Sequence, residues 1–456
     1  MLDPTIFRAY DIRGIVDKGL TADIVCDLGK AIASLALEKG ETSLIVGRDG
    51  RLSGPTLSAA LQKGILSTGC NIIDIGMVPT PLVYYATHIL NSRSGVMLTG
   101  SHNPGEYNGL KMVIASKPLS EQQIQSLYQR VMNKDFISGQ GILEKIDIVD
   151  RYLSRITDAI TLKRPLTIAI DCGNGITGNI APQLFKKMGC HVHELFCEVD
   201  GRFPNHHPDP SEAKNLQDLM TLVKEKKADI GLAFDGDGDR LGVVTTNGTI
   251  IWSDRLLMLF AKSILKSQPN AKIIYDIKCS NYLAKVIKEH GGEPIIWKTG
   301  HSLIKAKLIE TKAALAGEMS GHIFFNDDWY GFDDSLYAAA RLLKILAEST
   351  GNSDALFSDI PDGVNTPELK ILVSDQEKFG LMEQLVATAN YGNAEIMTID
   401  GLRVNFTDGW GLVRPSNTTP CLVLRFEAED NSGLTRIKNL FREHLLMVKP
   451  DWVLPF

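Results

Sequence analysis

The most unusual stretch of the sequence is residues 235–240, Asp-Gly-Asp-Gly-Asp-Arg, in which three carboxylates alternate with glycines. Carboxylates this close repel one another unless a cation lies among them, and their oxygens suit a hard cation such as Mg²⁺. A calcium EF-hand loop begins similarly, but it needs Gly at its sixth position and Glu at its twelfth, where this chain has Arg240 and Thr246. The stretch predicts a magnesium site formed by Asp235, Asp237 and Asp239.

A serine just past a predicted strand is the second candidate. Residues 95–98, Gly-Val-Met-Leu, are typical of a short buried strand, and Ser101 follows among turn-forming residues. In α/β proteins, ligands bind at such strand ends. Ser101 could be a nucleophile, a phosphate ligand or part of a turn, and no Gly-x-Ser-x-Gly pattern surrounds it to indicate acyl transfer. Lys111 could exchange a proton or hold a phosphate, whereas His102 more often orients such a loop than acts as a base.

Two more loops carry groups suited to a phosphorylated sugar. Glu318 and Ser320 stand at alternate positions and can reach vicinal sugar hydroxyls, and His322 could act as an acid or base or simply donate a hydrogen bond. Near the C-terminus, one short loop collects a guanidinium, hydroxyls and an amide, a combination that favours phosphate binding with the planar arginine as anchor. Its residues are Arg414, Ser416, Asn417 and Thr418.

The elements that must position these loops recur three times. Each unit opens with an apolar strand ending in Asp, at residues 44–49, 168–171 and 273–276. A helix-like stretch and a second strand follow, at residues 69–73, 189–192 and 291–296. A third apolar run, at residues 95–98, 230–234 and 313–316, leads to Ser101, Asp235 and Glu318 respectively. This spacing indicates βαβ crossovers in three similar α/β domains that offer strand-end loops to a shared cleft.

The length bounds the number of domains. A chain of 456 residues is too long for one hydrophobic core, and we expect three or four domains. The expected limits are 1–147, 148–249, 250–361 and 362–456. The first three are α/β domains with mixed sheets, and the last is a smaller α+β domain.

Composition argues against several classes of partner. The chain is 44% hydrophobic with a net charge of −6 and has no long basic block, which disfavours nucleic-acid binding. No apolar run approaches the roughly 18 residues needed to span a membrane, and residues 1–4 lack the features of a signal peptide. Seven scattered cysteines without a Cys-x-x-Cys pattern favour reduced thiols and a cytoplasmic protein. No extra interface element is evident, so a monomer is favoured.

Together these motifs resemble the α-D-phosphohexomutase family, most of all its bacterial phosphomannomutase/phosphoglucomutase members. The resemblance runs from residues 7–14, Phe-Arg-Ala-Tyr-Asp-Ile-Arg-Gly, to the Arg414 loop. It implies four domains around one deep cleft, with Ser101 as phosphoserine and Mg²⁺ held by Asp235, Asp237, Asp239 and the Ser101 phosphate. It also implies the basic neighbour Arg240, sugar readers Glu318 and Ser320, phosphate-binding residues Arg414, Ser416, Asn417 and Thr418, and further cleft residues Tyr10, Arg13, Lys111, Lys278, His301 and His322. One departure is Gly100, where much of the family has alanine. Glycine is the smaller residue, so this departure puts none of these roles in doubt.

The resemblance further implies a reaction. A hexose 1-phosphate, of mannose or glucose, becomes the 6-phosphate through a hexose 1,6-bisphosphate intermediate, with Lys111 or His322 moving the hydroxyl proton. A phosphosugar would then be the partner, with neither nucleic acid nor membrane required. Three alternatives stay open: a phosphoglucosamine mutase, disfavoured by Met319 where those enzymes tend to carry Gln; a Mg²⁺-dependent sugar phosphatase; and a non-catalytic sugar-phosphate-binding protein.

Overall fold

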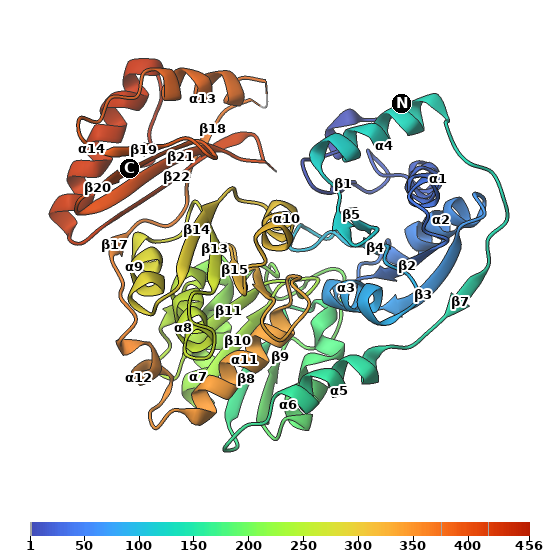
Figure 1. The fold of residues 1–456 in the computed structure, drawn as a ribbon, viewed down its shortest axis with the longest axis horizontal. Coiled ribbons are helices and arrows are strands. Elements are labelled where there is room, and N and C mark those ends of the chain that lie inside the picture. Colours follow the sequence, from blue (N-terminus) through green and yellow to red (C-terminus); the bar gives the residue numbers. More distant parts are fainter. Residues whose placement is uncertain (1, 375, 418) are drawn as a thin grey trace.

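Four β-sheets, each packed against helices, follow one another along the chain (Figure 1). The computed structural model describes residues 2–374, 376–417 and 419–456. The first three units have mixed sheets, and the fourth is a smaller antiparallel unit, so the expected fold class is confirmed.

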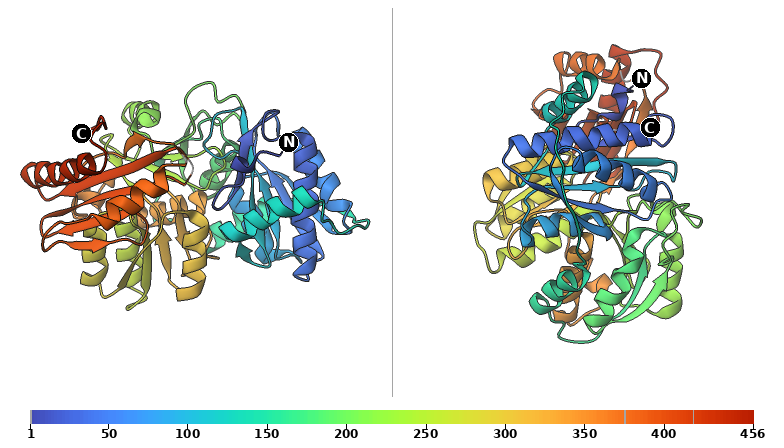
Figure 2. Two further views of the ribbon diagram at one scale, coloured as in Figure 1. Left: turned by 90° about the horizontal axis from the view of Figure 1, so that it is seen from above. Right: turned by 90° about the vertical axis from the view of Figure 1, so that its right-hand side faces the viewer.

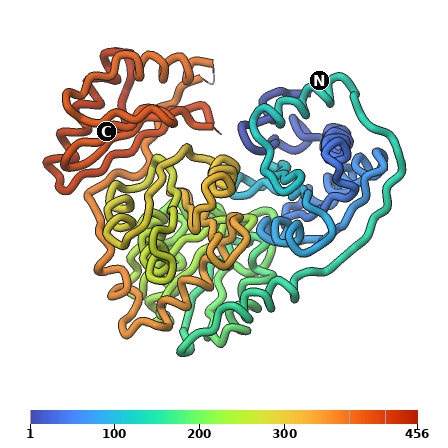
Figure 3. The backbone as a smooth tube through the Cα atoms, in the orientation of Figure 1, coloured from blue at the N-terminus to red at the C-terminus, as the bar shows by residue number. Residues whose placement is uncertain are grey.

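The first unit holds a seven-stranded sheet with strand order β1-β5-β4-β2-β3-β7, and β6 pairs with β5. Its elements are β1 (Ile12–Ile15), α1 (Ala22–Glu38), β2 (Ser43–Arg48), α2 (Gly54–Leu66), β3 (Asn71–Met77), α3 (Thr80–Ile89), β4 (Gly95–Leu98), β5 (Tyr107–Ile114), β6 (Lys117–Pro118), α4 (Glu121–Asn133) and β7 (Leu143–Lys145). The long connection from α4 to the second unit, which includes β7, runs along the outside of the first unit (Figure 3).

The second and third units repeat the centre of the first. The second contains α5 (Val149–Ala159), β8 (Thr167–Asp171), α6 (Ala181–Lys187), β9 (His191–Leu195), α7 (Gln217–Lys226), β10 (Ile230–Phe234), β11 (Leu241–Thr245) and β12 (Ile250–Ile251). The third contains α8 (Ser253–Leu265), β13 (Lys272–Asp276), α9 (Asn281–Glu289), β14 (Glu293–Trp297), α10 (His301–Thr311), β15 (Leu315–Gly317), β16 (Ile323–Phe325), α11 (Ser335–Glu348) and α12 (Ser353–Ser358).

The repeat predicted from the sequence is visible in the strand order. The three units share the orders β5-β4-β2-β3, β11-β10-β8-β9 and β16-β15-β13-β14. In each, three parallel strands are followed by an antiparallel partner. Ser101, Asp235 and Glu318 all fall on the loop that joins the last parallel strand to that partner. The same sequence position in each unit is therefore the same place in space relative to its sheet.

The fourth unit is built differently. An antiparallel sheet contains β17 (Val364–Asn365), β18 (Leu369–Leu372), β19 (Glu395–Met397), β20 (Leu402–Phe406), β21 (Gly409–Pro415) and β22 (Cys421–Ala428). Two helices, α13 (Lys378–Ala387) and α14 (Asn431–Val448), accompany it. In Figure 1 this unit lies across the molecule from the first, and Figure 2 shows the four units from above and from the right-hand side.

Alternation along the central strands explains how the layers pack. On β2, Leu44 and Val46 enter one core with α1 and α2, whereas Ile45 enters a core that contains α3. That second core continues through the second and third units, while the fourth unit has its own.

The sheet of the second unit extends slightly past the expected boundary at residue 249, because β12 pairs with β11 as far as residue 251. The expected limits 1–147, 148–249, 250–361 and 362–456 stay a prediction.

Across the described residues, no helix is both long and apolar enough to cross a bilayer.

Candidate functional site

The strand-end loops of all four units meet at one cavity of about 650 Å³. The sequence-predicted residues that line it are Tyr10, Arg13, Ser101, His102, Lys111, Arg240, Lys278, His301, Glu318, Ser320, His322, Arg414, Ser416 and Asn417. Asp235, Asp237 and Asp239 are fully buried behind the cavity wall, where Asp235 contacts Ser101 and the other two contact Lys111. Thr418 lies outside the described residues.

The Ser101 loop is held in an uncommon backbone conformation. Ser101 has a φ of 50°, in the left-handed region, and its amide donates to Thr99 Oγ1 at 2.8 Å. Its Oγ lies 3.2 Å from both His102 Nδ1 and Asp235 Oδ2. The hydroxyl thus faces the acidic loop with an imidazole at its side.

Arg51 fixes this loop from behind. Its guanidinium donates to the backbone carbonyls of Ser101 (2.8 Å), Asn103 (2.5 Å), Pro104 (2.5 Å) and Tyr107 (2.9 Å). Arg51 Nε also pairs with Asp49 Oδ2 at 3.2 Å, and Arg51 is buried. Sequence reasoning missed this arginine because it stands some 50 positions before the loop it holds.

The contact explains the glycine before the serine. A Cβ on Gly100 would lie 2.5 Å from the Arg51 guanidinium carbon, closer than side chains approach one another. Alanine there would require Arg51 to shift. In this chain the missing side chain at Gly100 therefore leaves the space that the Arg51 guanidinium occupies.

The acidic loop turns sharply around Asp235. Its Oδ1 accepts hydrogen bonds from the amides of Gly238, Asp239 and Arg240 at 2.9, 3.0 and 3.2 Å. Gly238 has a φ of 79°, which a glycine adopts without strain. From α3 of the first unit, Thr80 Oγ1 donates to Asp237 Oδ2 at 2.5 Å. Backbone and side-chain donors from two units therefore fold the three carboxylates together.

Lys111 balances part of the negative charge. Its ammonium lies 2.7 Å from Asp237 Oδ2 and also bonds Asp239. Burial opposes the charge on Lys111, but Asp237 and Asp239 outweigh it and hold the pKa of the amine well above its ordinary value. Lys111 is therefore protonated in this state, and it neutralises carboxylates instead of offering a lone pair.

The remaining carboxylate oxygens fit a cation. Asp237 Oδ1 and Asp239 Oδ1 are buried and accept no hydrogen bond from the described residues. Burial, with Asp239 and Asp237 nearby, raises the pKa of Asp235 well above its ordinary value. A divalent cation among Asp235, Asp237, Asp239 and Ser101 would satisfy these oxygens.

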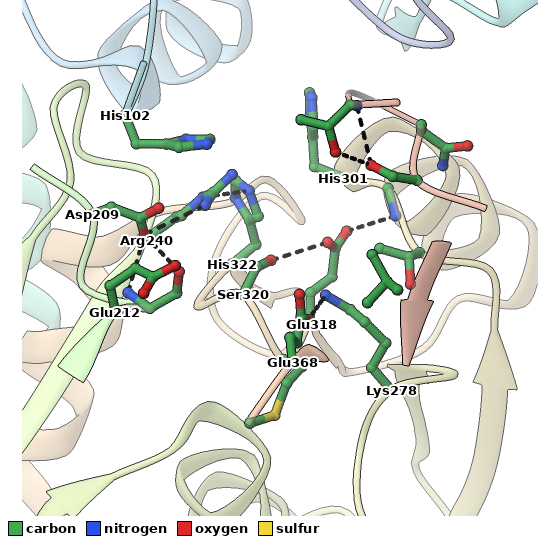
Figure 4. Close-up of a pocket in the computed structure, with 18 of the residues that line it drawn as sticks. His102, Asp209, Glu212, Arg240, Lys278, His301, Glu318, Ser320, His322 and Glu368 are labelled. Carbon is green, nitrogen blue, oxygen red and sulfur yellow. Dashed lines mark hydrogen bonds and ion pairs between the residues drawn. The ribbon is translucent and has the colours of Figure 1, made fainter. Parts of the chain in front are cut away.

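Arg240 lies between the second and third units (Figure 4). Its Nε donates to His322 Nε2 at 3.1 Å, while Asp209 Oδ1 and Asp235 Oδ2 are each 3.9 Å from its guanidinium. Asp209 was not predicted from the sequence, although it sits in the turn-forming run 206–210. Although burial opposes its charge, the Arg240 guanidinium and hydrogen bonds from Ser211 hold the pKa of Asp209 far below its ordinary value.

The imidazole of His102 is the neutral neighbour of the serine. Burial, followed by the charge of Arg240, keeps the pKa of His102 well below its ordinary value. A neutral ring 3.2 Å from Ser101 Oγ can accept or donate a hydrogen bond there without adding charge.

The third loop presents acceptors to the middle of the cavity. Glu318 accepts from the Gly300 amide at 3.2 Å and from Ser320 Oγ at 3.3 Å. Nearby, Lys278 pairs with Glu368 at 2.6 Å, an unpredicted carboxylate from the fourth unit that Figure 4 places beside it. These side chains can read the hydroxyls of a bound sugar by accepting and donating hydrogen bonds.

The fourth loop offers cation and hydroxyl groups. Arg414 pairs with Asp400 through Nε at 3.0 Å and Nη2 at 3.3 Å, which orients the guanidinium at the cavity. Ser416 Oγ lies 2.7 Å from Thr419 Oγ1, and its carbonyl accepts from Lys378 Nζ at 2.8 Å. Tyr10 and His301 meet edge to face with ring centres 5.5 Å apart on the same wall. Burial raises the pKa of Tyr10 to about 12, so its hydroxyl stays protonated.

Comparison with known proteins agrees with this architecture. Family profiles described as phosphoglucomutase/phosphomannomutase alpha/beta/alpha domains I, II and III match residues 4–138, 150–248 and 252–362. The profile of the C-terminal domain matches residues 368–444.

Individual relatives cover nearly the whole chain. A phosphomannomutase/phosphoglucomutase of Pseudomonas putida is 54% identical over 455 residues, covering 100% of this chain and 98% of that protein. A phosphoglucomutase of Neisseria meningitidis is 52% identical, covering 96% of each. A crystal structure of a phosphoglucomutase/phosphomannomutase family protein from Burkholderia thailandensis is 50% identical and superposes with a TM-score of 0.96 over 100% of both chains. With all four domain profiles in order and relatives above half identity, this chain belongs to the phosphoglucomutase/phosphomannomutase family.

Proposed function

We propose that this protein is a phosphohexomutase that interconverts the 1-phosphate and 6-phosphate of mannose, glucose or both. One observation carries the proposal: a single cavity contains Ser101 beside the acidic loop 235–239 and, from the fourth unit, the Arg414 loop. A serine that exchanges a phosphoryl group needs a metal-binding loop beside it. A substrate that carries a second phosphate needs a separate loop to bind that phosphate. The names of the relatives that cover the whole chain support the same activity.

Ser101 is the phosphoryl carrier in this proposal. The P–O bond to a phosphorylated Ser101 breaks as a bond forms to the sugar's free hydroxyl. The hydroxyl proton passes to a base in the cavity, for which His322 is the candidate, Ser101 Oγ takes up a proton, and the product is a hexose 1,6-bisphosphate. After this intermediate turns over in the cavity, the reverse transfer from the other position restores phosphoserine and releases the isomer. No phosphate is lost, so the reaction needs no nucleotide.

The acidic loop and the cations around it have complementary roles. Held by Asp235, Asp237, Asp239 and Ser101, Mg²⁺ would offset the negative charge of the transferring phosphoryl group. Arg240 faces the same region and stabilises that charge from the other side. Lys111 keeps the acidic loop compact; as the ammonium it can return a proton to a departing oxygen, and His102 is the neutral ring nearest the serine.

The rest of the cavity positions the sugar. Arg414, Ser416 and Asn417 bind the phosphate that does not react, with Tyr10, Arg13 and Lys278 adding donors, and Glu318 and Ser320 take the ring hydroxyls beside His301. Asp400 pre-orients Arg414, so less conformational freedom is lost on binding. All seven cysteines are free thiols, in keeping with a cytoplasmic enzyme.

Phosphorus-31 NMR tests the proposal directly. Purified protein with Mg²⁺, a trace of glucose 1,6-bisphosphate and mannose or glucose 1-phosphate should convert the 1-phosphate signal to that of the 6-phosphate. Inorganic phosphate in its place would indicate a phosphatase, and unchanged spectra with both sugars would indicate a binding protein. Glucosamine 1-phosphate, run in parallel, tests the amino-sugar alternative.

A further inference from the structure

The guanidinium of Arg51 uses every hydrogen-bond donor that it has. A guanidinium carries five N–H groups in one rigid plane, and each of those of Arg51 has an acceptor. The acceptors are Asp49 Oδ2 and the backbone carbonyls of Ser101, Asn103, Pro104 and Tyr107. Arg51 is 1% exposed and does not line the cavity, so these bonds hold the serine loop from within the protein.

Asp49 holds the same loop at a second point. Its Oδ2 accepts from the Thr99 hydroxyl at 2.8 Å and from the Gly100 amide at 3.3 Å. The Thr99 hydroxyl in turn accepts from the Ser101 amide at 2.8 Å. The amide and the carbonyl of Ser101 are therefore both fixed, and with them the direction in which the serine side chain leaves the backbone.

The second unit packs against the face of the same guanidinium. The centre of the Phe203 ring lies 5.1 Å from the guanidinium carbon of Arg51, which is a cation–π distance. The two backbones also meet, because a Cβ on Gly201 would lie 2.7 Å from Arg51 Cα, and one on Gly50 would lie 2.2 Å from Val199 Cγ1. Arg51 therefore contacts the serine loop with its edge and the segment 199–203 with its face.

Two strained residues meet at this one side chain. Ser101 has a φ of 50° and Phe203 a φ of 51°, a left-handed region that bulky side chains rarely adopt. Residues in such conformations cost free energy, persist only where their surroundings hold them, and are frequent at functional sites. Arg51 contacts both, which indicates that the placement of the serine loop relative to the second unit is under tight constraint.

That placement decides where the serine meets the acidic loop. Ser101 comes from the first unit and the acidic loop from the second, and Ser101 Oγ lies 3.2 Å from Asp235 Oδ2. The backbones are in direct contact, because a Cβ on Gly236 would lie 2.4 Å from the Ser101 carbonyl oxygen. A displacement of about 1 Å between reacting groups can lower a rate by about 100-fold. Accurate contact between the two units is therefore a requirement for phosphoryl transfer.

We propose that Arg51 is a positioning residue for the mutase reaction. Together with Asp49 and Phe203, it sets the Ser101 loop against the second unit, so that the phosphoserine and the acidic loop keep one geometry during transfer. The inference rests on the proposed function, and it adds three residues that do not line the cavity.

A pair of matched lysine variants tests the role of the guanidinium. Lysine has three donors, so Arg51→Lys leaves at least two of the five acceptors without a partner. The variant should lower kcat for mannose or glucose 1-phosphate about 10- to 100-fold. KM should change less than about threefold, because Arg414 and Glu318 bind the substrate from other units. Arg48→Lys is the control, since Arg48 lies on the same segment and donates to the Asp49 carbonyl at 3.1 Å. Equal kcat values for the two variants would overturn the proposal.

Substitution of the aromatic ring tests the contact between the units. Phe203→Tyr keeps the π face and should retain the wild-type kcat. Phe203→Leu keeps apolar bulk without that face and should lose about two- to fivefold in kcat, the range that one cation–π contact supplies. Equal kcat values for these two variants would refute the role of Phe203. This comparison decides the matter even if Arg51→Lys does not fold.

Coupling between the two residues separates positioning from a loss of stability. Arg51→Lys combined with Phe203→Leu should lower kcat by less than the product of the two single effects, because both act through one contact. A full multiplicative loss would contradict the inference. Each kcat is expressed per folded protein, with the folded fraction taken from thermal melts, so that unfolded enzyme is not counted as slow enzyme. An inactive wild type would refute the proposed function, whereas an active wild type with an equally active Arg51→Lys variant would refute the positioning role alone.

Discussion

Replacement of Lys111 by methionine should make the stability of the first unit depend on magnesium. The side chain is 3% exposed, and its ammonium pairs with both Asp237 and Asp239. Methionine has a similar length but no charge, so three buried carboxylates would face one another with one cation fewer. Removal of one partner from a buried ion pair costs about 3–5 kcal/mol.

The expected loss is large enough to measure by thermal unfolding. For a unit of 150 to 250 residues, 1 kcal/mol corresponds to about 2–4 °C, so the first transition should fall by about 6–20 °C in EDTA. Mg²⁺ binds the folded loop and replaces the missing positive charge, so it should raise the melting temperature of the variant more than that of the wild type.

Lys117→Met is the matched control, because Lys117 is exposed on the neighbouring β6. That variant should melt like the wild type with and without Mg²⁺. The reasoning would be refuted if Lys111→Met also melted like the wild type in EDTA, or if Mg²⁺ raised both melting temperatures equally.

Four other substitutions probe separate parts of the molecule. Ser101→Ala should carry no phosphate by intact-mass analysis and should lose turnover by orders of magnitude; near-normal rates would remove Ser101 as carrier. Arg414→Ala should raise KM with a smaller effect on kcat, because its phosphate contact is present in both ground and transition states; an unchanged KM would place that phosphate elsewhere. Gly100→Ala should cost about 1–3 kcal/mol in urea unfolding, because the new methyl group crowds Arg51, and an unchanged midpoint would contradict this. Burial raises the pKa of Asp334 to about 7, so the folded state binds the proton more tightly and stability should fall as pH rises from about 4 to 7. Asp334→Asn should flatten that dependence in urea titrations at pH 5 and 8, and an unaltered slope would argue against it.

The sequence alone was sufficient to predict the positions of functional groups that directly follow a strand. Ser101, Asp235 and Glu318 lie on loops just past β4, β10 and β15, and parallel pairing brings such loops to one edge of a sheet. Local spacing therefore predicted the repeat, the acidic loop and the cavity they share.

Local sequence spacing does not predict which residues of different units contact one another. Lys111 meets Asp237 across 126 positions, and Glu368 meets Lys278 across 90. Nothing near Phe203 or Arg51 in the sequence indicates their partners, because those contacts arise from how one unit packs on another and how one loop folds behind the next. The role of His322 as a proton carrier stays a prediction from its residue type, and its hydrogen bond to Arg240 depends on tertiary geometry that the sequence does not reveal.

The order of the four units along the chain has a consequence for synthesis. The ribosome delivers Ser101 first, then the acidic loop, then Glu318, and Arg414 last, because each unit contributes its own loop. Domains fold largely as they emerge, so an incomplete chain can already form the serine loop and the acidic loop. The cavity lacks the Arg414 side of its lining until the final unit docks. Translation thus completes the lining of the cavity only when its last unit has been made.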